Sequence, residues 1–328
     1  MSVSVIMVSY FTGPVLVRSV EAALSSPLVA DVVLVDNGNP DGVVDQLKDW
    51  SKREPRLTLL SGHGNIGFAA GSNRGAEAAT GQTFLFLNPD AVLGQGAVDL
   101  LVDVGEASSR QLWSVGPRLV NPDGTEQQGG RRDILTPWNA FVEASRLYKL
   151  APNHPRFRRF NSHETEELTA VTAVPCLSGA AFMVPGQAFK AIGGFDEGYF
   201  LHVEDIDFFL RFEQAGGQAY YVPQAEVTHY KSSSRVDPLR IERLKKQSLN
   251  RYFARHYSGI YPRGFLTLLR AMLWLSFGFR FTLWRVRRLG RFAVFSCRNG
   301  LKAALRGARF SKRLGRLGKR SSIDEGPI

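Results

Sequence analysis

Cysteine is nearly absent from this chain, since Cys176 and Cys297 are the only two among its 328 residues. Two cysteines so far apart provide neither a disulfide framework nor the paired spacing of a zinc site. Scarce cysteine is typical of a reducing compartment. The N-terminus opens on an apolar segment without a charged leader, so we expect no signal peptide and a cytoplasmic location.

A long apolar run is also missing. Towards the C-terminus the longest apolar stretch is residues 271–279, whereas a helix needs about 20 apolar residues to span a bilayer. We therefore expect no transmembrane helix, and any contact with a membrane would be made at its surface.

Acidic residues are lacking from one long segment, residues 280–320, which holds 14 Lys and Arg. The first 279 residues carry 27 bases and 28 acids, so the formal charge of +11 belongs to the end of the chain. Such asymmetry predicts an anionic partner, either a membrane or a nucleic acid. Phe, Leu and Trp alternate with arginine from residue 262 onward, which favours an anionic membrane surface and no nucleic acid. We predict a body at residues 1–260 and a basic amphipathic tail at 261–328.

What the chain does contain is a regular alternation of apolar segments in its first ninety residues. Continuous apolar runs, typical of buried strands, alternate with segments of helical spacing. This order predicts an α/β fold with a mostly parallel, doubly wound sheet. The predicted strands are residues 3–10, 32–35, 57–60 and 84–87, and the predicted helices are residues 15–24, 43–50 and 68–79. Later in the chain we expect short strands at 220–222 and 227–230 and helices from about 204 and over 238–258.

Acids follow two of the predicted strands, at the edge where open α/β sheets bind their ligands. Asp36 follows the second strand, and Asn88-Pro89-Asp90 follows the fourth. Amide and carboxylate oxygens suit Mg²⁺ or Mn²⁺, and such an ion would bridge to a pyrophosphate. Taken alone, the tripeptide is better explained as a strand-ending turn.

A second acidic group, Glu204-Asp205-Ile206-Asp207, opens a predicted helix. Acids in a first turn complement the helix dipole, and Asp207 precedes Arg211 by four residues, the favourable order for a surface ion pair. Glu204 and Asp205 remain without such an explanation. A carboxylate in partly apolar surroundings has a raised pKa and serves as a general base.

Two further motifs leave alternatives open. His229 alone is most simply a structural hydrogen-bonding residue, but beside a metal and a diphosphate it would stabilise the leaving phosphate. The dinucleotide fingerprint is matched by Gly62-His63-Gly64-Asn65-Ile66-Gly67, so an NAD-dependent oxidoreductase is an alternative. Against that alternative, the motif follows the third strand rather than the first, and the sequence has no Tyr-x-x-x-Lys pair.

Taken together and in order, these segments resemble the bacterial family 2 glycosyltransferases, notably their rhamnosyltransferase-like branch. The likeness covers roughly residues 3–260. The matching segments are residues 33–37, 65–75, 86–91, 178–184, 193–197 and 204–207.

The resemblance implies a GT-A fold, with a nucleotide-binding half at about residues 1–115 and an acceptor half at 116–260. It implies an inverting, metal-dependent hexosyltransferase that uses Mg²⁺ or Mn²⁺. The enzyme would move a sugar such as rhamnose from a nucleotide-sugar donor to a lipid-linked oligosaccharide or polysaccharide such as lipopolysaccharide. This reaction would occur at the inner face of the cytoplasmic membrane.

Residue roles also follow from the resemblance. Asp205 would be the catalytic base with Glu204 beside it, and Asp90, Asn88 and His229 would lie at the metal, with Asn88 in place of the first Asp of the D-x-D motif. The implied substrate-binding residues are Ser9, Tyr10, Asp36, Asn65, Gly67, Asn73, Arg74, Asn88 and His229. Phe11 follows Ser9-Tyr10 where many relatives have Asn, so the nucleotide contacts there would differ.

Overall fold

The computed structural model describes residues 1–151, 154–157, 159–161, 168–231, 237–278 and 281–282. It divides into two compact units, Met1–Leu273 and Trp274–Ile328. In the second unit only residues 274–278 and 281–282 are described, and they are helical. Most of the basic segment at 280–320 therefore lies outside the described residues. In the part of the chain that the structure describes, no helix combines the length and the apolar character needed to cross a bilayer.

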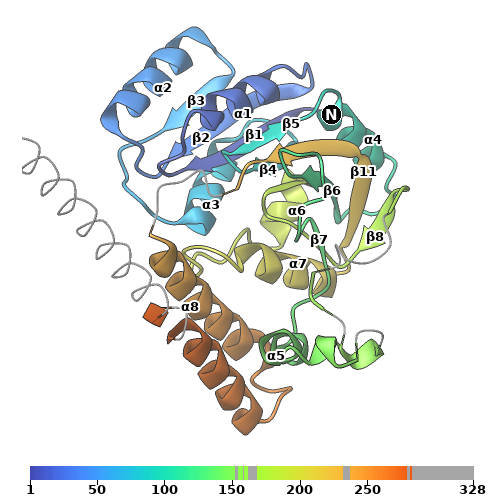
Figure 1. Ribbon diagram of the computed structural model, residues 1–328. Coiled ribbons are helices and arrows are strands. Elements are labelled where there is room, and N and C mark those ends of the chain that lie inside the picture. The colour runs from blue at the N-terminus through green and yellow to red at the C-terminus, as the bar shows by residue number, and fades with distance from the viewer. Residues whose placement is uncertain (152–153, 158, 162–167, 232–236, 279–280, 283–328) are drawn as a thin grey trace, which may run out of the picture. The chain divides into compact units, whose positions relative to one another are not determined.

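A nine-stranded sheet forms the centre of the first unit (Figure 1). Its first half has the order β3-β2-β1-β4, and every neighbouring pair in it is parallel. The continuous apolar runs predicted here are strands connected by helices. Strands β1 and β4 are buried throughout and β2 is buried at all but one residue, whereas β3, at the edge of the sheet, is only partly buried. The strands are β1 (Val3–Ser9), β2 (Val29–Asp36), β3 (Leu57–Leu60) and β4 (Thr83–Leu87), and the connecting helices are α1 (Val15–Leu24), α2 (Asp41–Arg53) and α3 (Phe68–Ala78).

The second half of the sheet is mixed, with the order β10-β6-β11-β5 and β8 paired to β11. Strand β10 lies antiparallel between β4 and β6, and β11 runs parallel to β6 but antiparallel to β5 and β8. The parallel arrangement expected for the whole sheet therefore describes mainly its first half. The elements are β5 (Ala91–Leu93), α4 (Ala97–Glu106), β6 (Trp113–Val120), β8 (Thr172–Val174), β10 (Ala181–Pro185), α6 (Gly186–Ala191) and β11 (Gln218–His229).

Strand β11 replaces the two short strands expected at residues 220–222 and 227–230. The chain forms one strand with a register shift between Val222 and Glu226 against β6. A separate two-stranded sheet joins β7 (Arg131–Arg132) to β9 (Cys176–Leu177). The polar loop before β7 is thereby fixed beside the main sheet.

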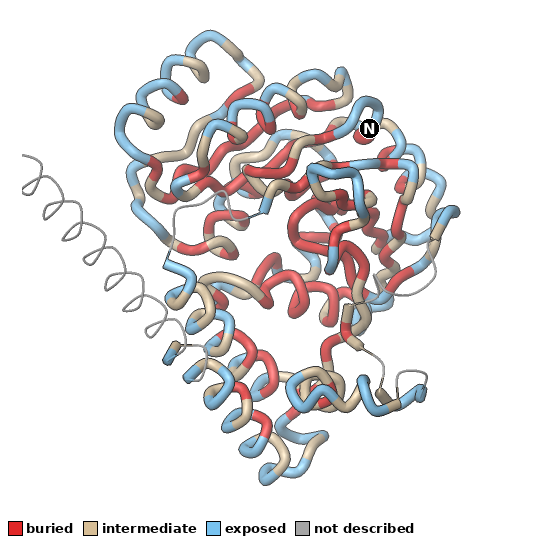
Figure 2. The backbone as a smooth tube through the Cα atoms, viewed as in Figure 1, coloured by how far each residue is buried: buried red, intermediate tan, exposed pale blue. Residues whose placement is uncertain are grey.

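Two hydrophobic clusters cover the two faces of the sheet. Met7 packs with α1 and α4 on one face, while its neighbour Ile6 packs with α3, α6 and α7 (Glu204–Gln214) on the other. This division follows from the alternation of side chains along a strand. Figure 2 shows that burial is concentrated in the strands and in α7.

A third cluster lies on the far side of α7, where α5 (Pro137–Ser145), α8 (Pro238–Tyr257) and residues 263–273 form a helical layer. Helix α7 therefore lies between two cores: Phe208 and Phe209 belong to the second cluster, and Ile206 and Leu210 to the third. Leu269 belongs to this third cluster and is only 1% exposed. The first part of the predicted tail thus packs on the body.

Candidate active site

Asn88, Asp90 and His229 lie together, although His229 is far from the other two in sequence. Strand β11 pairs with β5 so that His229 faces Ala91, and Tyr230 N donates to the Asp90 carbonyl over 2.9 Å. The Nε2 atom of His229 lies 3.2 Å from Asp90 Oδ1 and 3.3 Å from Asn88 Nδ2. The structure therefore brings together the three residues that the sequence suggested for a metal site.

Gln127, which the sequence analysis missed, determines how His229 is oriented. Its Nε2 donates to the His229 carbonyl over 2.9 Å and to Asn121 Oδ1 over 3.0 Å. Because both amide hydrogens are used, its Oε1 must be the acceptor for His229 Nδ1, 2.7 Å away. A proton on Nδ1 leaves a lone pair on Nε2 of the neutral imidazole. That is the form of histidine that binds a metal.

The chemistry of this cluster fits a divalent cation. In the neutral imidazole, the Nε2 lone pair and a carboxylate oxygen of Asp90 face each other across 3.2 Å, and two acceptors so placed favour a positive charge between them, either a metal ion or a proton. Among the described residues no three His, Cys, Asp or Glu side chains gather at one point. The remaining ligands would be water, donor phosphate and the Asn88 amide oxygen, which would have to replace Nδ2 by rotation of the amide.

The ends of β1 and β2 form a second polar cluster. Asp36 Oδ1 accepts from Gly38 N over 3.1 Å and from Asn39 N over 2.8 Å, which closes a tight turn. Asn39 Nδ2 also donates to Asp36 Oδ1 and to Ser9 Oγ, over 2.8 and 2.9 Å. The Tyr10 ring lies against Gly38, where a Cβ would be only 3.4 Å from a ring carbon. The predicted donor-binding residues Ser9, Tyr10 and Asp36 therefore meet around Asn39.

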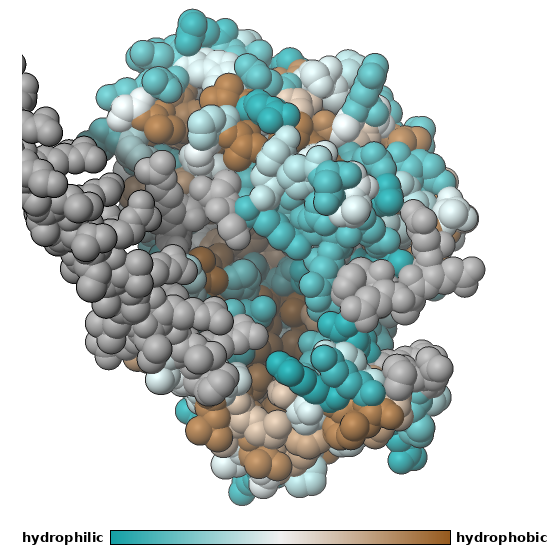
Figure 3. All heavy atoms as spheres, viewed as in Figure 1, coloured by the Kyte–Doolittle hydropathy of each residue, from teal (hydrophilic) through white to brown (hydrophobic). Residues whose placement is uncertain are grey.

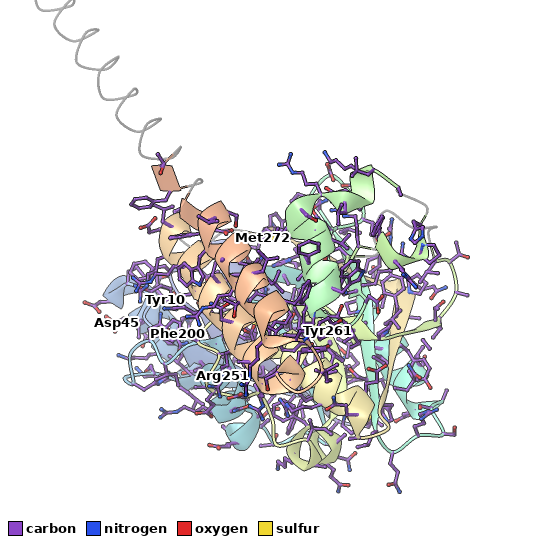
Figure 4. All side chains as sticks on the ribbon, turned by 90° about the horizontal axis from the view of Figure 1, so that it is seen from below. Tyr10, Asp45, Phe200, Arg251, Tyr261 and Met272 are labelled. Carbon is purple, nitrogen blue, oxygen red and sulfur yellow. The ribbon has the colours of Figure 1, made fainter. Side chains whose placement is uncertain are left out.

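The loop of the glycine-rich motif connects this cluster to the segment before α7. Asn65 Oδ1 accepts from Gly67 N over 3.0 Å, and Asn37 Nδ2 donates to the Gly67 carbonyl over 2.9 Å. Gly67 has φ 90°, and a Cβ there would lie 2.7 Å from the Phe200 carbonyl oxygen. Phe68 N donates to that same oxygen over 2.8 Å. Figure 4 shows Phe200 on the same side of the first unit as Tyr10.

Asn73 and Arg74 on α3 differ in what they contact. Asn73 Nδ2 donates to the Phe195 carbonyl and to Glu197 Oε1, each over 2.9 Å, and its Oδ1 accepts from Phe195 N over 2.9 Å. These bonds use both hydrogens and the oxygen of the amide to attach α3 to the loop at 193–197. Arg74 is exposed, and after burial its charge is the second cause that lowers the pKa of His63. Arg74 therefore lies near His63 in the glycine-rich loop.

Glu204 and Asp205 are both buried at the start of α7. The helix begins abruptly because His202 and Val203 before it have φ values of 65° and 75°. Left-handed backbone is costly for a β-branched residue and is often retained at functional sites. The Phe200–Val203 segment is also held from the helical layer, since Ser248 Oγ donates to the Leu201 carbonyl over 3.0 Å.

The two carboxyl groups have different environments. Burial alone would raise the pKa of Asp205, but the Arg132 guanidinium and the N–H groups of Gly179 and Ile206 hold it below its ordinary value. Burial, and then the charge of Asp205, raise the pKa of Glu204 to about 8. Glu204 Oε2 is buried and has no hydrogen-bond partner among the described residues. At neutral pH, Asp205 is therefore ionised and Glu204 is largely protonated. The raised pKa that the sequence led us to expect for the base is found at Glu204 and not at Asp205, because Arg132 offsets the burial of Asp205.

Asp207 corrects one expectation from the sequence. Its Oδ2 does pair with Arg211 Nε over 2.7 Å, but the side chain is 0% exposed, so this is not a surface ion pair. Its Oδ1 accepts from Tyr199 Oη over 3.1 Å and meets His256 Nε2 of α8 over 2.6 Å. Tertiary packing, which the helical spacing does not reveal, turns Asp207 into a buried link between α7 and α8.

One short segment joins the two candidate clusters. Gly179 N donates to Asp205 Oδ2 over 2.9 Å, and Asn88 N donates to the Ala180 carbonyl over 2.8 Å. The acid pair and the Asn88 cluster are therefore attached to adjacent residues, 179 and 180. Figure 3 shows the surface of the unit hollowed between the sheet and the helical layer.

Comparison with known proteins identifies the family of the chain. The model of glycosyl transferase family 2 matches residues 4–173. The N-acetylglucosaminyl-diphospho-decaprenol L-rhamnosyltransferase of Mycobacterium tuberculosis is 30% identical over 243 residues, which cover 70% of this chain and 76% of that protein. Rhamnosyltransferase WbbL of Escherichia coli is 38% identical over 65 residues, 20% of this chain and 25% of that protein.

Solved structures share the fold. GalNAc-T7 with UDP, GalNAc and Mn²⁺ aligns with a TM-score of 0.54 and 18% identity over 83% of this chain and 53% of that chain. The mannosyltransferase PcManGT from Pyrobaculum calidifontis, with GDP-Man and Mn²⁺, aligns with a TM-score of 0.52 and 18% identity over 83% and 69%. The predicted GT-A-type α/β fold is confirmed, and the oxidoreductase alternative has no support. The chain therefore belongs to glycosyl transferase family 2, and it is a glycosyltransferase.

Proposed function

We propose that this enzyme transfers a sugar from a nucleoside-diphosphate donor to a lipid-linked oligosaccharide or polysaccharide acceptor in cell-surface glycan synthesis. The observation that carries the proposal is the attachment of the Asn88-Asp90-His229 cluster and the Glu204-Asp205 pair to residues 179 and 180. A diphosphate and an acceptor hydroxyl would thus meet at one place. The name of the mycobacterial relative supports a lipid-linked acceptor and makes rhamnose the first donor sugar to test.

The proposed reaction is a single inverting displacement. Mg²⁺ or Mn²⁺ held by Asp90, His229 and Asn88 would supply positive charge to the donor diphosphate. Asp205, ionised beside Arg132, would accept the proton of the acceptor hydroxyl while that oxygen forms its bond to the sugar C1. The bond from C1 to the diphosphate oxygen breaks at the same time, and its electron pair leaves with the nucleoside diphosphate. Glu204, neutral at pH 7, would donate a hydrogen bond at the same site.

The donor nucleoside would lie at the ends of β1 and β2. Asp36 uses one oxygen to close the turn at Asn39, so its other oxygen would receive the base. Tyr10 would contact the base, while Ser9, Asn65 and Gly67 would shape the loop around it. Arg74 would contact the donor from α3. For Asn73, which is fully engaged with Phe195 and Glu197, a structural role accounts for the residue without any substrate contact.

The decisive experiment is a panel of nucleotide sugars measured by thermal shift with Mn²⁺ or Mg²⁺, followed by a transfer assay with the stabilising donor. A donor at 100 times its Kd should stabilise the protein by about 2.7 kcal/mol. Stabilisation by NAD(H), with none from any nucleotide sugar, would contradict the proposal.

We also propose peripheral binding to the inner face of the cytoplasmic membrane through the basic tail. Leu269 and Leu273 are buried in the body, so residues before 274 would contribute only their outer side, where Ile260 is 73% and Leu268 52% exposed. Phe265 lies beside them and stacks on Tyr261, with ring centroids 5.6 Å apart. Apolar side chains of this kind bind the headgroup boundary, and each nearby base adds about 1 kcal/mol of attraction to an anionic leaflet.

The test of membrane binding is sedimentation with anionic vesicles. The full chain should bind and should lose part of that binding at high salt, whereas a chain ending at Leu273 should bind more weakly. The cut is placed there because the compact first unit extends to Leu273. Equal sedimentation of the two chains, or no binding by either, would contradict the proposal.

A further inference from the structure

We infer that Arg132 is a positioning residue of the active site, which acts through Asp205 to make one member of the acid pair the charged proton acceptor and to leave the other neutral. The inference rests on the proposed glycosyl transfer and deepens it. Neither the motifs of the sequence nor their spacing indicated this residue.

Arg132 is fixed at both ends of its side chain. Its backbone pairs with Cys176 in the β7–β9 sheet, and its Nε donates to the Gly129 carbonyl over 2.8 Å. At the tip, Nη1 donates to Asp205 Oδ2 over 2.7 Å and Nη2 to Ser178 Oγ over 3.3 Å. A guanidinium held in this way presents its charge at one defined point.

The Asp205 carboxylate is held beside that charge by hydrogen bonds to both of its oxygens. Its Oδ2 accepts a second bond from Gly179 N over 2.9 Å, and its Oδ1 accepts from Ile206 N over 2.9 Å. Gly179 lies so close that a Cβ there would be 2.9 Å from the Asp205 Cβ. Any side chain at 179 would displace the carboxylate, so the glycine and the arginine together fix where Asp205 lies.

Because Glu204 is adjacent, the charge of Arg132 affects which of the two acids carries the proton. Two adjacent buried carboxyl groups do not both ionise readily, and their protons are shared unless a nearby charge distinguishes them. The charge of Arg132 lowers the pKa of both acids, but it is the largest charge effect on Asp205, to which Arg132 also donates a hydrogen bond, and only the smallest cause at Glu204. Glu204 Oε2 has no hydrogen-bond partner among the described residues. Without the guanidinium, the proton that now resides on Glu204 would be distributed over both, and the ionised fraction of Asp205 would fall.

Other titratable groups near Asp205 do not replace Arg132. Burial lowers the pKa of His202 to about 4 and raises the pKa of the Cys176 thiol, so both are neutral at pH 7. From α8, Lys245 and Glu242 act on His202 with opposite effects on its pKa. Lys231 lies near enough to Arg132 that the arginine lowers its pKa, after the larger effect of burial.

The test compares Arg132→Met, Arg132→Lys and a control, Arg118→Met, by the pH dependence of kcat and kcat/KM in the transfer assay at saturating donor. Arg118 is a suitable control because it is another partly buried arginine in an ion pair, which its Nη1 makes with Glu226 Oε1 of β11 over 2.6 Å. At pH 7, Arg132→Met should lower kcat by about 10²–10³, within the range for loss of general-base catalysis. The acid limb of the profile should move to higher pH, and the rate should recover as the pH rises through that limb. Arg132→Lys should restore part of the rate with an intermediate limb. Donor binding, measured by thermal shift, should be unchanged.

Other results with these variants would contradict the inference. If Arg132→Met loses activity but keeps the acid limb of the wild-type enzyme, Arg132 is only a structural ion pair and the inference fails. The inference also fails if Arg132→Met weakens donor binding by the same factor as it lowers kcat. If Arg132→Met does not fold, the limb of Arg132→Lys decides by the same criterion. A failure of the proposed function is separate, because then the wild-type enzyme would transfer no sugar at any pH.

Discussion

The Asp90–His229 cluster and the Glu204–Asp205 pair are attached to adjacent residues, yet the described partners of their carboxylates differ. At Asp90 the described side-chain partner is a histidine, which Gln127 holds in place: His229 Nε2 lies 3.2 Å from Asp90 Oδ1. At Asp205 the positive charge is part of the chain, because Arg132 donates directly to the carboxylate. We therefore propose that the first cluster is completed by a cation that arrives with the substrate, whereas the second already contains a positive charge from the chain.

The largest effect is expected at the acid pair, where a substitution tests whether Asp205 is the charged member. Asp205→Asn keeps the shape of the side chain but removes the base, so turnover should fall by about 10²–10⁴ while donor binding survives. Transfer kinetics and thermal shift with the donor measure the two effects. If Asp205→Asn keeps near-wild-type turnover and Glu204→Gln is inactive, the base is Glu204, and the two acids have exchanged roles.

The metal side of the comparison is tested by Asp90→Ala. Because Asp90 would hold the ion that contacts the diphosphate, the stabilisation of about 2.7 kcal/mol expected at 100 times Kd of donor should disappear in this variant. The melting temperature without donor serves as the control for folding. Full activity of the wild-type enzyme in excess EDTA would reject a metal role altogether.

The protonation state of Glu204 is tested by the free energy of unfolding rather than by activity. Its pKa is raised from 4.5 to about 8 in the folded protein, so the unfolded chain loses this proton at lower pH than the folded chain. Its contribution to stability is complete below about pH 4.5 and is lost as the pH rises to about 8. One pKa unit corresponds to about 1.4 kcal/mol, and we expect Glu204→Gln to be more stable than wild type by roughly 1–3 kcal/mol at pH 8.

Urea unfolding at pH 5 and pH 8 measures this difference. The gain of Glu204→Gln should be small at pH 5 and clear at pH 8, together with reduced turnover. A gain that is the same at both pH values would mean that Glu204 is charged throughout, and the assignment of a neutral member of the pair would be wrong.

Gln127 provides the smallest effect. Gln127→Leu removes the acceptor that fixes the His229 tautomer but leaves all proposed ligands, so Mn²⁺ affinity should fall about 10- to 100-fold, as for other groups that orient a metal ligand. The apparent Kd for Mn²⁺ in donor binding gives the measurement, with Gln128→Leu as the neighbouring control. Equal effects of the two substitutions would show that the loop, rather than the hydrogen bond to His229, is responsible.

The sequence predicted the elements whose patterns are local. The helix at 15–24 and the strand at 57–60 occur with the predicted bounds, because each has a clear apolar period of its own. The apolar patterns predict no helix or strand over residues 91–170, yet this region contains α4, β6 and α5. Long-range pairing determines such elements: β6, for example, is completed by β10 and β11 from much later in the chain.

The same difference between local and long-range features applies to the candidate site. Strand ends and a family resemblance singled out Asp90, Asn88 and His229, and the structure brings these three residues together. Gln127 and Arg132 could not be singled out in this way, because each acts through a partner about 75 to 100 residues away, at His229 and Asp205. Asp207 was misjudged for the same reason, since the layer that buries it is built from α8.

The position of α7 between two cores has a consequence for cooperativity. Phe208 and Phe209 anchor the helix to the sheet, whereas Ile206 and Leu210 anchor it to the helical layer. Neither core can loosen without disturbing the helix that begins with the acid pair. We therefore expect the sheet and the helical layer to melt in a single transition, and a cavity made on either side, far from the reacting atoms, to reduce activity in proportion to its effect on folding.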